Sequence, residues 1–480
     1  MTQASYAMNP MKTAFRWTAG ACVALMLLVA LGGAQGTPDA AKPKETKTYT
    51  VETEGQPLFN KPTASLGVSA RLSKGTELTI ISTNGAWMQV QGAGTQAGWV
   101  QGPRRRRLGG TPVDDNYIKS KTTAETSTGL VTKGFGKGYG KQHGVSDEEA
   151  ARTEQQLRSQ PFEFEAFEKF LAAGKLNFSE ADTEPQPTTP AETDTTPTKP
   201  KLGPSRGLPE SLRQGISASR VRMDMTRDPH YFAKNFSYEE EEEMGYAVAQ
   251  RLAAGKIHDS VELHEYVNLI GSTLVEHSDR SDIPYLFVVL NTPDINAFAA
   301  PGGYIFITTG CIAACKNEAE MAAVLGHEVA HVARRHAARQ LDDHRLKIAK
   351  SMLGAQMDKS LEELYGPMDP NRAALIKELQ SMADVHYKAC TAGWGQKFEL
   401  EADEFGVRYA KNAGWDYSGM LEFLKVLRAG EKPQVGKGWD SHPPASERIA
   451  TLERLAKAEG WKHSGIFLAE RFGRFSALLK

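Results

Sequence analysis

The segment from Asn317 to Gln340 constrains the fold more than any other part of this 480-residue chain. Asn317 is a favourable N-cap, and Glu320 follows three residues later, as in a capping box. Four apolar side chains then recur at helical spacing and give one apolar stripe. They are Met321, Leu325, Val329 and Val332. We therefore predict one helix over residues 317–340, with a defined start and a buried side.

Within this segment, His327, Glu328 and His331 form the pattern H-E-x-x-H. Residues four apart lie one above the other on a helix, so both imidazoles can reach one Zn²⁺ at about 2.0–2.1 Å. Glu328 would then stand beside the metal, where its carboxylate can take a proton from zinc-bound water and pass it to a leaving amine. The alternative for the five-residue pattern alone is a helix with two ordinary, partly buried histidines.

Two flanking segments favour the metal site. Residues 296–310 contain two extended runs around a Pro-Gly-Gly turn, and residues 398–406 read Phe-Glu-Leu-Glu-Ala-Asp-Glu-Phe-Gly. In this order, the three blocks resemble the zinc metalloendopeptidases of the CAAX prenyl protease, HtpX, Oma and BepA-like family, which are gluzincins. The resemblance implies a zincin-like, mainly helical α+β catalytic domain that holds one Zn²⁺.

The same resemblance implies roles for further residues. The family pattern E-x-x-A-D makes Glu399 the third zinc ligand, with Asp403 orienting a ligand imidazole. His442 and Arg448 would lie at the cleft and assist the charged tetrahedral intermediate, although His442 could instead be an exposed loop residue. A peptide substrate would pair with one sheet edge. The residues of this edge are Asn296, Ala297, Phe298 and Ala299.

Composition alone does not choose between Glu399 and Glu401, because both precede Asp403. Spacing favours Glu399, which shares a helix face with Asp403 one turn later and can thus offer a ligand beside its partner. Glu401, two residues along, points well away from that face. We therefore expect Glu401 to take no part in zinc binding.

Net charge and cysteine content limit the possible partners. The formal net charge of −1 gives no reason to expect nucleic acid. Cys22 lies in the N-terminal apolar segment, which leaves Cys311, Cys315 and Cys390. This odd number implies at least one unpaired thiol and does not support a disulfide framework. Cys311 and Cys315 are interpreted as small core residues, with a redox or metal role as the alternative.

The N-terminal region has the pattern of a secretion signal. A basic start, an apolar run from Cys22 to Leu31 and small residues near Ala34 predict a signal peptide over residues 1–36. An uncleaved membrane anchor is the alternative. No other stretch approaches the roughly 18 apolar residues that a membrane span needs. We therefore expect a mature chain beyond the inner membrane, in the periplasm, with peripheral membrane contact at most.

Residues 46–103 are predicted to form a small all-β barrel. Short β-rich runs start at Thr48, Leu78, Trp87 and Ala97, separated by glycine, asparagine and serine. The segments at 72–78, 85–90 and 98–100 resemble bacterial SH3-like domains. That resemblance implies binding of cell-wall peptide or envelope protein segments. The alternative is a spacer barrel with Trp87 and Trp99 in its core.

Residues 104–210 are predicted to be a low-complexity linker. The basic run 104–107 is interpreted as solvated, with surface attraction to lipid or cell wall as the alternative. A glycine-rich segment at 134–140 and a Thr/Pro/acidic segment at 183–200 cannot bury a core. Between them, residues 147–175 have helical composition and could dock as a helix pair through four aromatic residues. These are Phe162, Phe164, Phe167 and Phe170.

The catalytic domain is predicted over residues 211–480. Ser237 would cap a helix with acidic residues 239–243 in its first turn, and a second helix would follow at 261–276. A strand at 284–291 and a hairpin at 296–309 would build a small sheet. Residues 341–397 show no recognisable chemistry. In periplasmic relatives, such an insertion can cover the active site.

The sequence as a whole predicts a multidomain, secreted zinc metalloendopeptidase that hydrolyses misfolded or envelope proteins. Protein and peptide substrates are its expected partners, with cell wall or envelope proteins bound through the barrel. The competing hypothesis is a cell-envelope chaperone that uses the protease fold to hold clients. The intact Glu328 weighs against this alternative, because a pure binding protein would not need the base.

Overall fold

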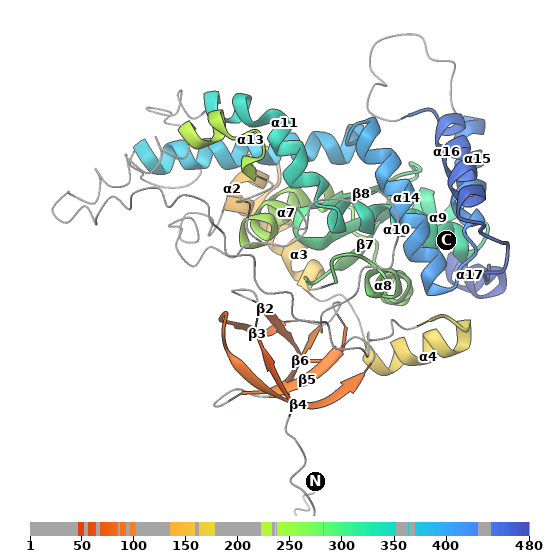
Figure 1. Ribbon diagram of the computed structural model, residues 1–480. Helices are drawn as coiled ribbons and strands as arrows, with labels where there is room; N and C mark the ends of the chain where they lie inside the picture. The colour runs from red at the N-terminus through yellow and green to blue at the C-terminus, as the bar shows by residue number, and fades with distance from the viewer. Residues whose placement is uncertain are drawn as a thin grey trace, which may run out of the picture. The chain divides into compact units, whose positions relative to one another are not determined.

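The computed structural model describes most of residues 47–479 (Figure 1). Outside the description lie residues 1–46, 52–55, 64–67, 85–86, 93–96, 102–134, 159–162, 178–221, 233–235, 237, 282, 352–362, 364–369, 431–442 and 480. The predicted signal peptide, the basic run at 104–107, the segment 183–200, Phe162, Ser237 and His442 therefore lie outside the described residues. Among the described residues, none of the helices combines the length and the apolar character needed to cross a membrane.

The N-terminal part is a six-stranded antiparallel sheet with strand order β1-β4-β5-β6-β2-β3. The strands are β1 (Thr48–Thr50), β2 (Gln56–Phe59), β3 (Val68–Leu72), β4 (Glu77–Asn84), β5 (Trp87–Gln91) and β6 (Gly98–Gln101). Small apolar side chains, among them Leu58, Leu78 and Val90, form its own core. The predicted all-β region is thus present, and its SH3-like identity stays a prediction.

Trp87 is not part of the apolar core inside the six-stranded sheet. Its ring packs edge-on against Phe59, with the centroids 5.3 Å apart, and both residues are buried in the cluster built around the helices. The indole Nε1 of Trp87 donates a hydrogen bond to Glu276 Oε2 at 2.9 Å. Trp99 is only partly buried. Trp87 therefore stabilises a contact between the sheet and the helical part, which the spacer-barrel interpretation did not foresee.

The glycine-rich segment at 134–140 does bury side chains, contrary to our expectation. It forms helix α2 (Phe135–Gln142), in which Phe135 and Tyr139 are buried. Its glycines allow close packing, because a Cβ on Gly136 would lie 2.4 Å from the ring of Tyr246 in helix α7 (Tyr238–Ala253). The lack of side chains, which suggested low complexity, is what lets this helix approach α7.

The predicted helix pair at 147–175 corresponds to α3 (Asp147–Arg158) and α4 (Phe164–Gly174). Phe167 and Phe170 of α4 are buried, and the Phe170 ring lies 6.3 Å from that of Tyr266. Tyr266 belongs to α8 (Val261–Glu276), a helix whose bounds match the prediction and whose N-cap Ser260 accepts from the Leu263 N–H. Helices α3 and α4, which lie inside the predicted linker, therefore pack on the helical part.

A three-stranded sheet with order β7-β9-β8 lies beside α8. Its strands are β7 (Leu286–Leu290), β8 (Ala297–Ala300) and β9 (Tyr304–Thr308), with β9 parallel to β7 and antiparallel to β8. The turn η2 (Pro301–Gly303) requires glycine, because Gly303 has a φ of 96° and a Cβ there would meet Pro284 O at 2.1 Å. The predicted strand and hairpin are confirmed, and β8 is an edge strand.

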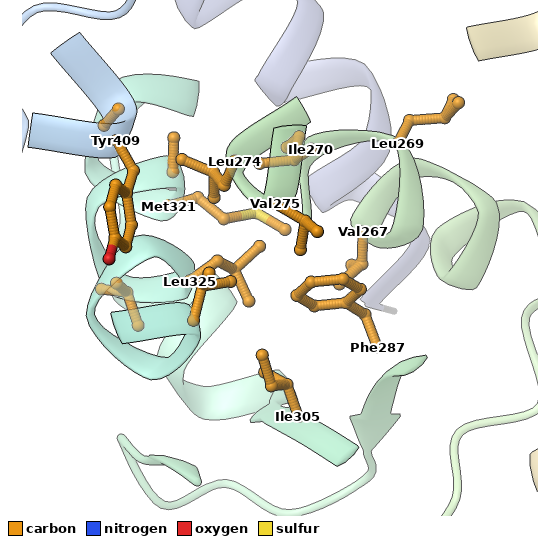
Figure 2. Packing of buried hydrophobic residues seen from close by; sticks show 14 of the residues in the cluster. Val267, Leu269, Ile270, Leu274, Val275, Phe287, Ile305, Met321, Leu325 and Tyr409 are labelled. Carbon is orange, nitrogen blue, oxygen red and sulfur yellow. The ribbon is translucent and has the colours of Figure 1, made fainter. Parts of the chain in front are cut away.

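The main core lies between this sheet, α8 and the metal helix α10 (Glu318–Ala333), which follows the short helix α9 (Thr309–Ala314). Figure 2 shows Leu274 and Val275 of α8 meeting Met321 and Leu325 of α10, with Phe287 of β7 beside them. Complete burial of each such side chain contributes about 1.5–3 kcal/mol. The predicted stripe residues are buried, as are the other residues of α10.

The prediction of one helix over 317–340 is wrong. Helix α10 ends at Ala333, and α11 (His336–Ser351) begins after Arg335, whose φ is 51°. This left-handed conformation is unfavourable for a residue with a Cβ. Tertiary contacts outweigh it, because Arg335 Nε donates to Glu241 Oε1 at 2.8 Å in a buried ion pair.

The remaining helices come after α11 in the chain, beyond residues 352–362 and 364–369, which lie outside the description. They are α13 (Pro370–Ala392), α14 (Gln396–Ala413), α15 (Ser418–Gly430), α16 (Ala445–Ala458), α17 (Ala469–Ser476) and η4 (Ala477–Leu479). Gly414 caps the C-terminal end of α14 with a φ of 110°. The N-terminal sheet followed by a mainly helical α+β part agrees with the predicted fold class.

Candidate metal centre

The start of α10 is fixed by caps and by a buried carboxylate. Asn317 Oδ1 accepts from the Glu320 N–H at 3.0 Å, and Glu320 Oε2 reaches back to the Lys316 N–H at 3.0 Å. Glu318 is fully buried and accepts from Tyr266 Oη at 2.8 Å, Trp415 Nε1 at 2.9 Å and Arg471 Nε at 2.7 Å. These contacts join α8, α14's C-terminal side and α17 to the first turn of the metal helix.

The predicted ligands His327, His331 and Glu399 converge in one buried group, with the donor atoms within 4.8 Å of one another. His327 Nε2 lies 3.0 Å from His331 Nε2 and 3.4 Å from Glu399 Oε2, and His331 Nε2 lies 3.9 Å from Glu399 Oε1. Donors at about 2.0–2.2 Å from a tetrahedral Zn²⁺ are roughly 3.4 Å apart. Two imidazoles and one carboxylate at these separations fit zinc.

A close crossing of α10 and α14 brings the third ligand to the two histidines. A Cβ on Gly406 would lie 2.5 Å from His327 N, and one on Gly326 would lie 2.7 Å from Gly406 O, so both positions require glycine. Glu399, in the first turn of α14, is 1% exposed. Its Oε1 accepts from the Trp394 N–H at 3.0 Å, which orients the carboxylate.

Asp403 lies one turn after Glu399 and contacts the other ring nitrogen of His327. Its Oδ1 is 2.9 Å from His327 Nδ1. Burial lowers the pKa of His327, but hydrogen bonds with Asp403 and Glu399 outweigh burial and raise it to about 10. A carboxylate on the second nitrogen fixes the tautomer and the orientation of a ligand imidazole. The geometry thus gives Asp403 the contact that its predicted orienting role needs.

Arg448 reaches the same carboxylate rather than an open cleft. Its Nε donates to Asp403 Oδ2 at 2.7 Å and its Nη2 to Asp403 Oδ1 at 2.5 Å. Burial opposes the charge, but Asp403, Glu399 and Glu328 together raise the pKa of Arg448 above its ordinary value. In these contacts Arg448 holds Asp403, and its predicted assistance to the intermediate stays a prediction.

Glu328 is 7% exposed on α10, beside His327. Its negative carboxylate contributes to raising the pKa of Arg448. It also helps to raise the pKa of the Cys390 thiol, although burial is the larger cause there. A negative group next to the metal ligands, with an arginine close by, matches the position expected of a general base.

His331 contacts aromatic residues that follow it in the chain. Its Nδ1 lies 2.8 Å from His336 Nδ1, and its ring stacks on Trp394 with the centroids 5.3 Å apart. Burial lowers the pKa of His336 to about 4, against the opposing effect of Glu401. His336 was not a sequence-predicted site residue.

Glu401 points away from the ligand group, as its spacing predicted, but it makes several contacts with other charged side chains. Its carboxylate accepts from Arg334 Nε at 2.8 Å and from Arg339 at 3.0 Å and 2.9 Å. It also lies 3.6 Å from His336 Nε2. The sequence signal that could have revealed this cluster is the pair of arginines and the histidine that follow the H-E-x-x-H pattern.

The predicted substrate edge is strand β8 with Asn296 before it. Asn296 O accepts from the Thr308 N–H of β9, so by strand alternation the backbone groups of Ala297 and Ala299 face the outer edge. Helix α13 lies at this edge, where the Cys390 thiol donates to Ala299 O at 3.2 Å. Residues from the segment 341–397 therefore contact both the edge, through Cys390, and His331, through Trp394. Cys311, Cys315 and Cys390 are all free and buried.

Comparison with known proteins agrees with this geometry. The family model described as "Peptidase family M48" matches residues 262–456, which contain the three predicted ligands together with Glu328, Asp403 and Arg448. Residues 262–456 belong to peptidase family M48. The predicted family is thereby confirmed.

Relatives of this M48 domain carry names of proteases. The chain is 27% identical over 220 residues to the "Beta-barrel assembly-enhancing protease" of Escherichia coli, covering 45% of this chain and 44% of that protein. It is 28% identical over 181 residues to human "Metalloendopeptidase OMA1, mitochondrial", covering 36% of this chain and 33% of that protein. The chain thus spans less than half the length of either relative.

Proposed function

We propose that this chain is a zinc-dependent metalloendopeptidase. The observation that carries the proposal is the buried set of His327, His331 and Glu399, with Glu328 on the same helix as the two histidines. The M48 match and the protease names of its relatives support the same reaction class.

The chain's own residues supply the acid–base chemistry. His327, His331 and Glu399 would hold Zn²⁺, which would supply Lewis-acid chemistry by lowering the pKa of water to about 7 and polarising a peptide carbonyl. Glu328 accepts the proton of the attacking water and donates it to the leaving amine. Asp403, held by Arg448, keeps His327 in the tautomer that presents Nε2 to the metal.

We propose that the substrate binds as an added strand along β8. The outward-facing groups of Ala297 and Ala299 are the ones available to a peptide backbone. A substrate N–H that pairs with Ala299 O would replace the hydrogen bond from the Cys390 thiol. The C-terminal end of α13 must therefore move away from β8 when substrate binds.

We further propose that the protein acts in the periplasm on misfolded or envelope proteins. The signal pattern at residues 1–36 and the resemblance to BepA-like proteases support this location and substrate class. N-terminal sequencing of the secreted protein should find a start shortly after Ala34, whereas a start at Met1 or Met11 would mean an uncleaved anchor. If the N-terminal β-sheet part binds cell wall or envelope protein, its removal should reduce co-sedimentation with envelope material.

The Glu328→Gln variant tests the proposed reaction. It removes the base without touching a ligand, so it should retain zinc while casein cleavage is abolished. Glu422→Gln is the matched control, because Glu422 lies on the surface of α15 and pairs with Lys425. Zinc content and cleavage are measured with and without a chelator. Turnover that persists in Glu328→Gln would refute the assignment of the base.

A further inference from the structure

The second ligand histidine has a chain of contacts of its own. His331 presents Nε2 to the other two ligands, and its Nδ1 lies 2.8 Å from Nδ1 of His336. The two rings stand nearly perpendicular, at 79°. His336 is fully buried, and its Nε2 lies 3.6 Å from Glu401 Oε2.

The proton positions along this chain follow from metal binding. A neutral imidazole carries one N–H, and the nitrogen that binds a metal must be the unprotonated one. Nδ1 of His331 therefore carries the hydrogen and donates it to Nδ1 of His336. His336 must then carry its own hydrogen on Nε2, which faces the Glu401 carboxylate.

Two arginines hold that carboxylate in place. Arg334 and Arg339 together donate three hydrogen bonds to Glu401, at 2.8–3.0 Å. These bonds hold the Glu401 carboxylate 3.6 Å from His336 Nε2, a charge contact that is longer than a hydrogen bond. The arrangement parallels the one at the first ligand, where Arg448 holds Asp403 against His327.

The helix break explains how His336 reaches this position. On a continuous helix, residue 336 would be turned about 140° from residue 331 and would point to another side. The left-handed Arg335 ends α10 and lets α11 begin at His336. The break therefore brings Nδ1 of His336 to the ligand.

We propose that His336 and Glu401 are positioning residues that hold the His331 imidazole in the orientation and tautomer needed for zinc binding. This inference rests on the proposed function, since it concerns the same metal site. It replaces our expectation that Glu401 takes no part in zinc binding.

The test must separate hydrogen bonding from packing, because the His336 ring also lies 4.8 Å from that of Phe398. His336→Asn keeps an acceptor near the position of Nδ1, whereas His336→Leu fills space without one. His386→Asn is the matched control for loss of a buried imidazole: His386 is fully buried, and neither ring nitrogen has a hydrogen-bond partner among the described residues.

Zinc affinity is measured by competition with a chelating dye, and the visible spectrum of the Co²⁺-loaded protein reports ligand geometry. His336→Leu should bind zinc about 10–100-fold more weakly and alter the spectrum. His336→Asn should recover most of that loss, and His386→Asn should bind like wild type. If His336→Leu does not fold, His336→Gln takes its place, because its amide reaches the Nε2 position instead and should weaken binding.

Unchanged zinc affinity in His336→Leu, or equal losses in the Leu and Asn variants, would overturn the proposal. Glu401→Gln tests the next contact and should weaken zinc binding less than His336→Leu, whereas wild-type affinity would remove Glu401 from the proposal. Wild-type zinc content and casein cleavage are measured in parallel. Failure of the proposed function would appear there, independently of the His336 variants.

Discussion

Replacement of Arg448 by methionine should destabilise the metal-free protein strongly. Arg448 and Asp403 are 8% and 1% exposed and share two hydrogen bonds, at 2.7 Å and 2.5 Å. Loss of Arg448 leaves the buried Asp403 carboxylate with His327 as its remaining charged partner, and breaking a buried ion pair costs about 3–5 kcal/mol. At roughly 2–4 °C per kcal/mol for a domain of this size, the unfolding temperature should fall by about 6–20 °C.

Differential scanning calorimetry of the metal-free protein measures this change. Arg454→Met is the control on the same helix, because Arg454 is exposed and donates locally, to Ala450 O and Thr451 Oγ1. A surface substitution of this kind should change stability by no more than about 0.5 kcal/mol. The two variants remove the same side chain, so their difference isolates burial and pairing.

A double variant, Asp403→Asn with Arg448→Met, sharpens the test. It removes both charges, so it should unfold at a higher temperature than Arg448→Met alone. A drop of less than about 4 °C in Arg448→Met, which corresponds to about 1–2 kcal/mol, would contradict the argument that Arg448 acts by holding Asp403.

Two further predictions concern the third ligand and a helix cap. Glu399→Ala should lose most of the zinc and all casein cleavage while Glu422→Ala keeps both, as elemental analysis can show; full zinc content in Glu399→Ala would mean that another group is the third ligand. Burial raises the pKa of Asp416, but hydrogen bonds from Ser418, His463 and Gly465 outweigh it and lower the pKa below its usual value. A carboxyl whose pKa is lowered by folding stabilises fully above its unfolded pKa near 3.9 and loses this effect as the pH falls through the folded value. Asp416→Asn should therefore unfold below the wild-type temperature at pH 7, and calorimetry should find the gap closing below about pH 4; a gap that persists there would contradict the assignment.

Features that depend on neighbouring residues could be predicted from the sequence. Asn317 caps α10, α8 spans the predicted residues 261–276, and the spacing of His327 and His331 puts both rings on one face of α10. The choice of Glu399 over Glu401 also used only the periodicity of a helix. In each case the deciding contact lies within about one helical turn.

Features that depend on distant residues were missed. The end of α10 depends on Arg335 pairing with Glu241, 94 residues earlier in the chain. Similarly, Trp87 bonds to Glu276, 189 residues away, and Gly136 of α2 leaves the space that the Tyr246 ring occupies. Local propensity carries no information about such distant partners.

The buried Glu318 carboxylate also bears on the order in which the protein is made. Arg471, which donates to it, lies 153 residues further along the chain. At about 5–20 residues per second, the ribosome adds Arg471 roughly 8–30 s after Glu318. During that interval His327 and His331 have been synthesised, but Glu318 in the first turn of α10 still lacks its hydrogen bonds from Arg471.

Translation therefore delivers the anchor of the metal helix after all three ligands. A nascent chain reaches Glu399 before it reaches α17, so it holds every zinc-binding group while the start of α10 is still incompletely held. We expect a rigid, hydrolytically competent centre to arise only once α17 has been synthesised and has docked.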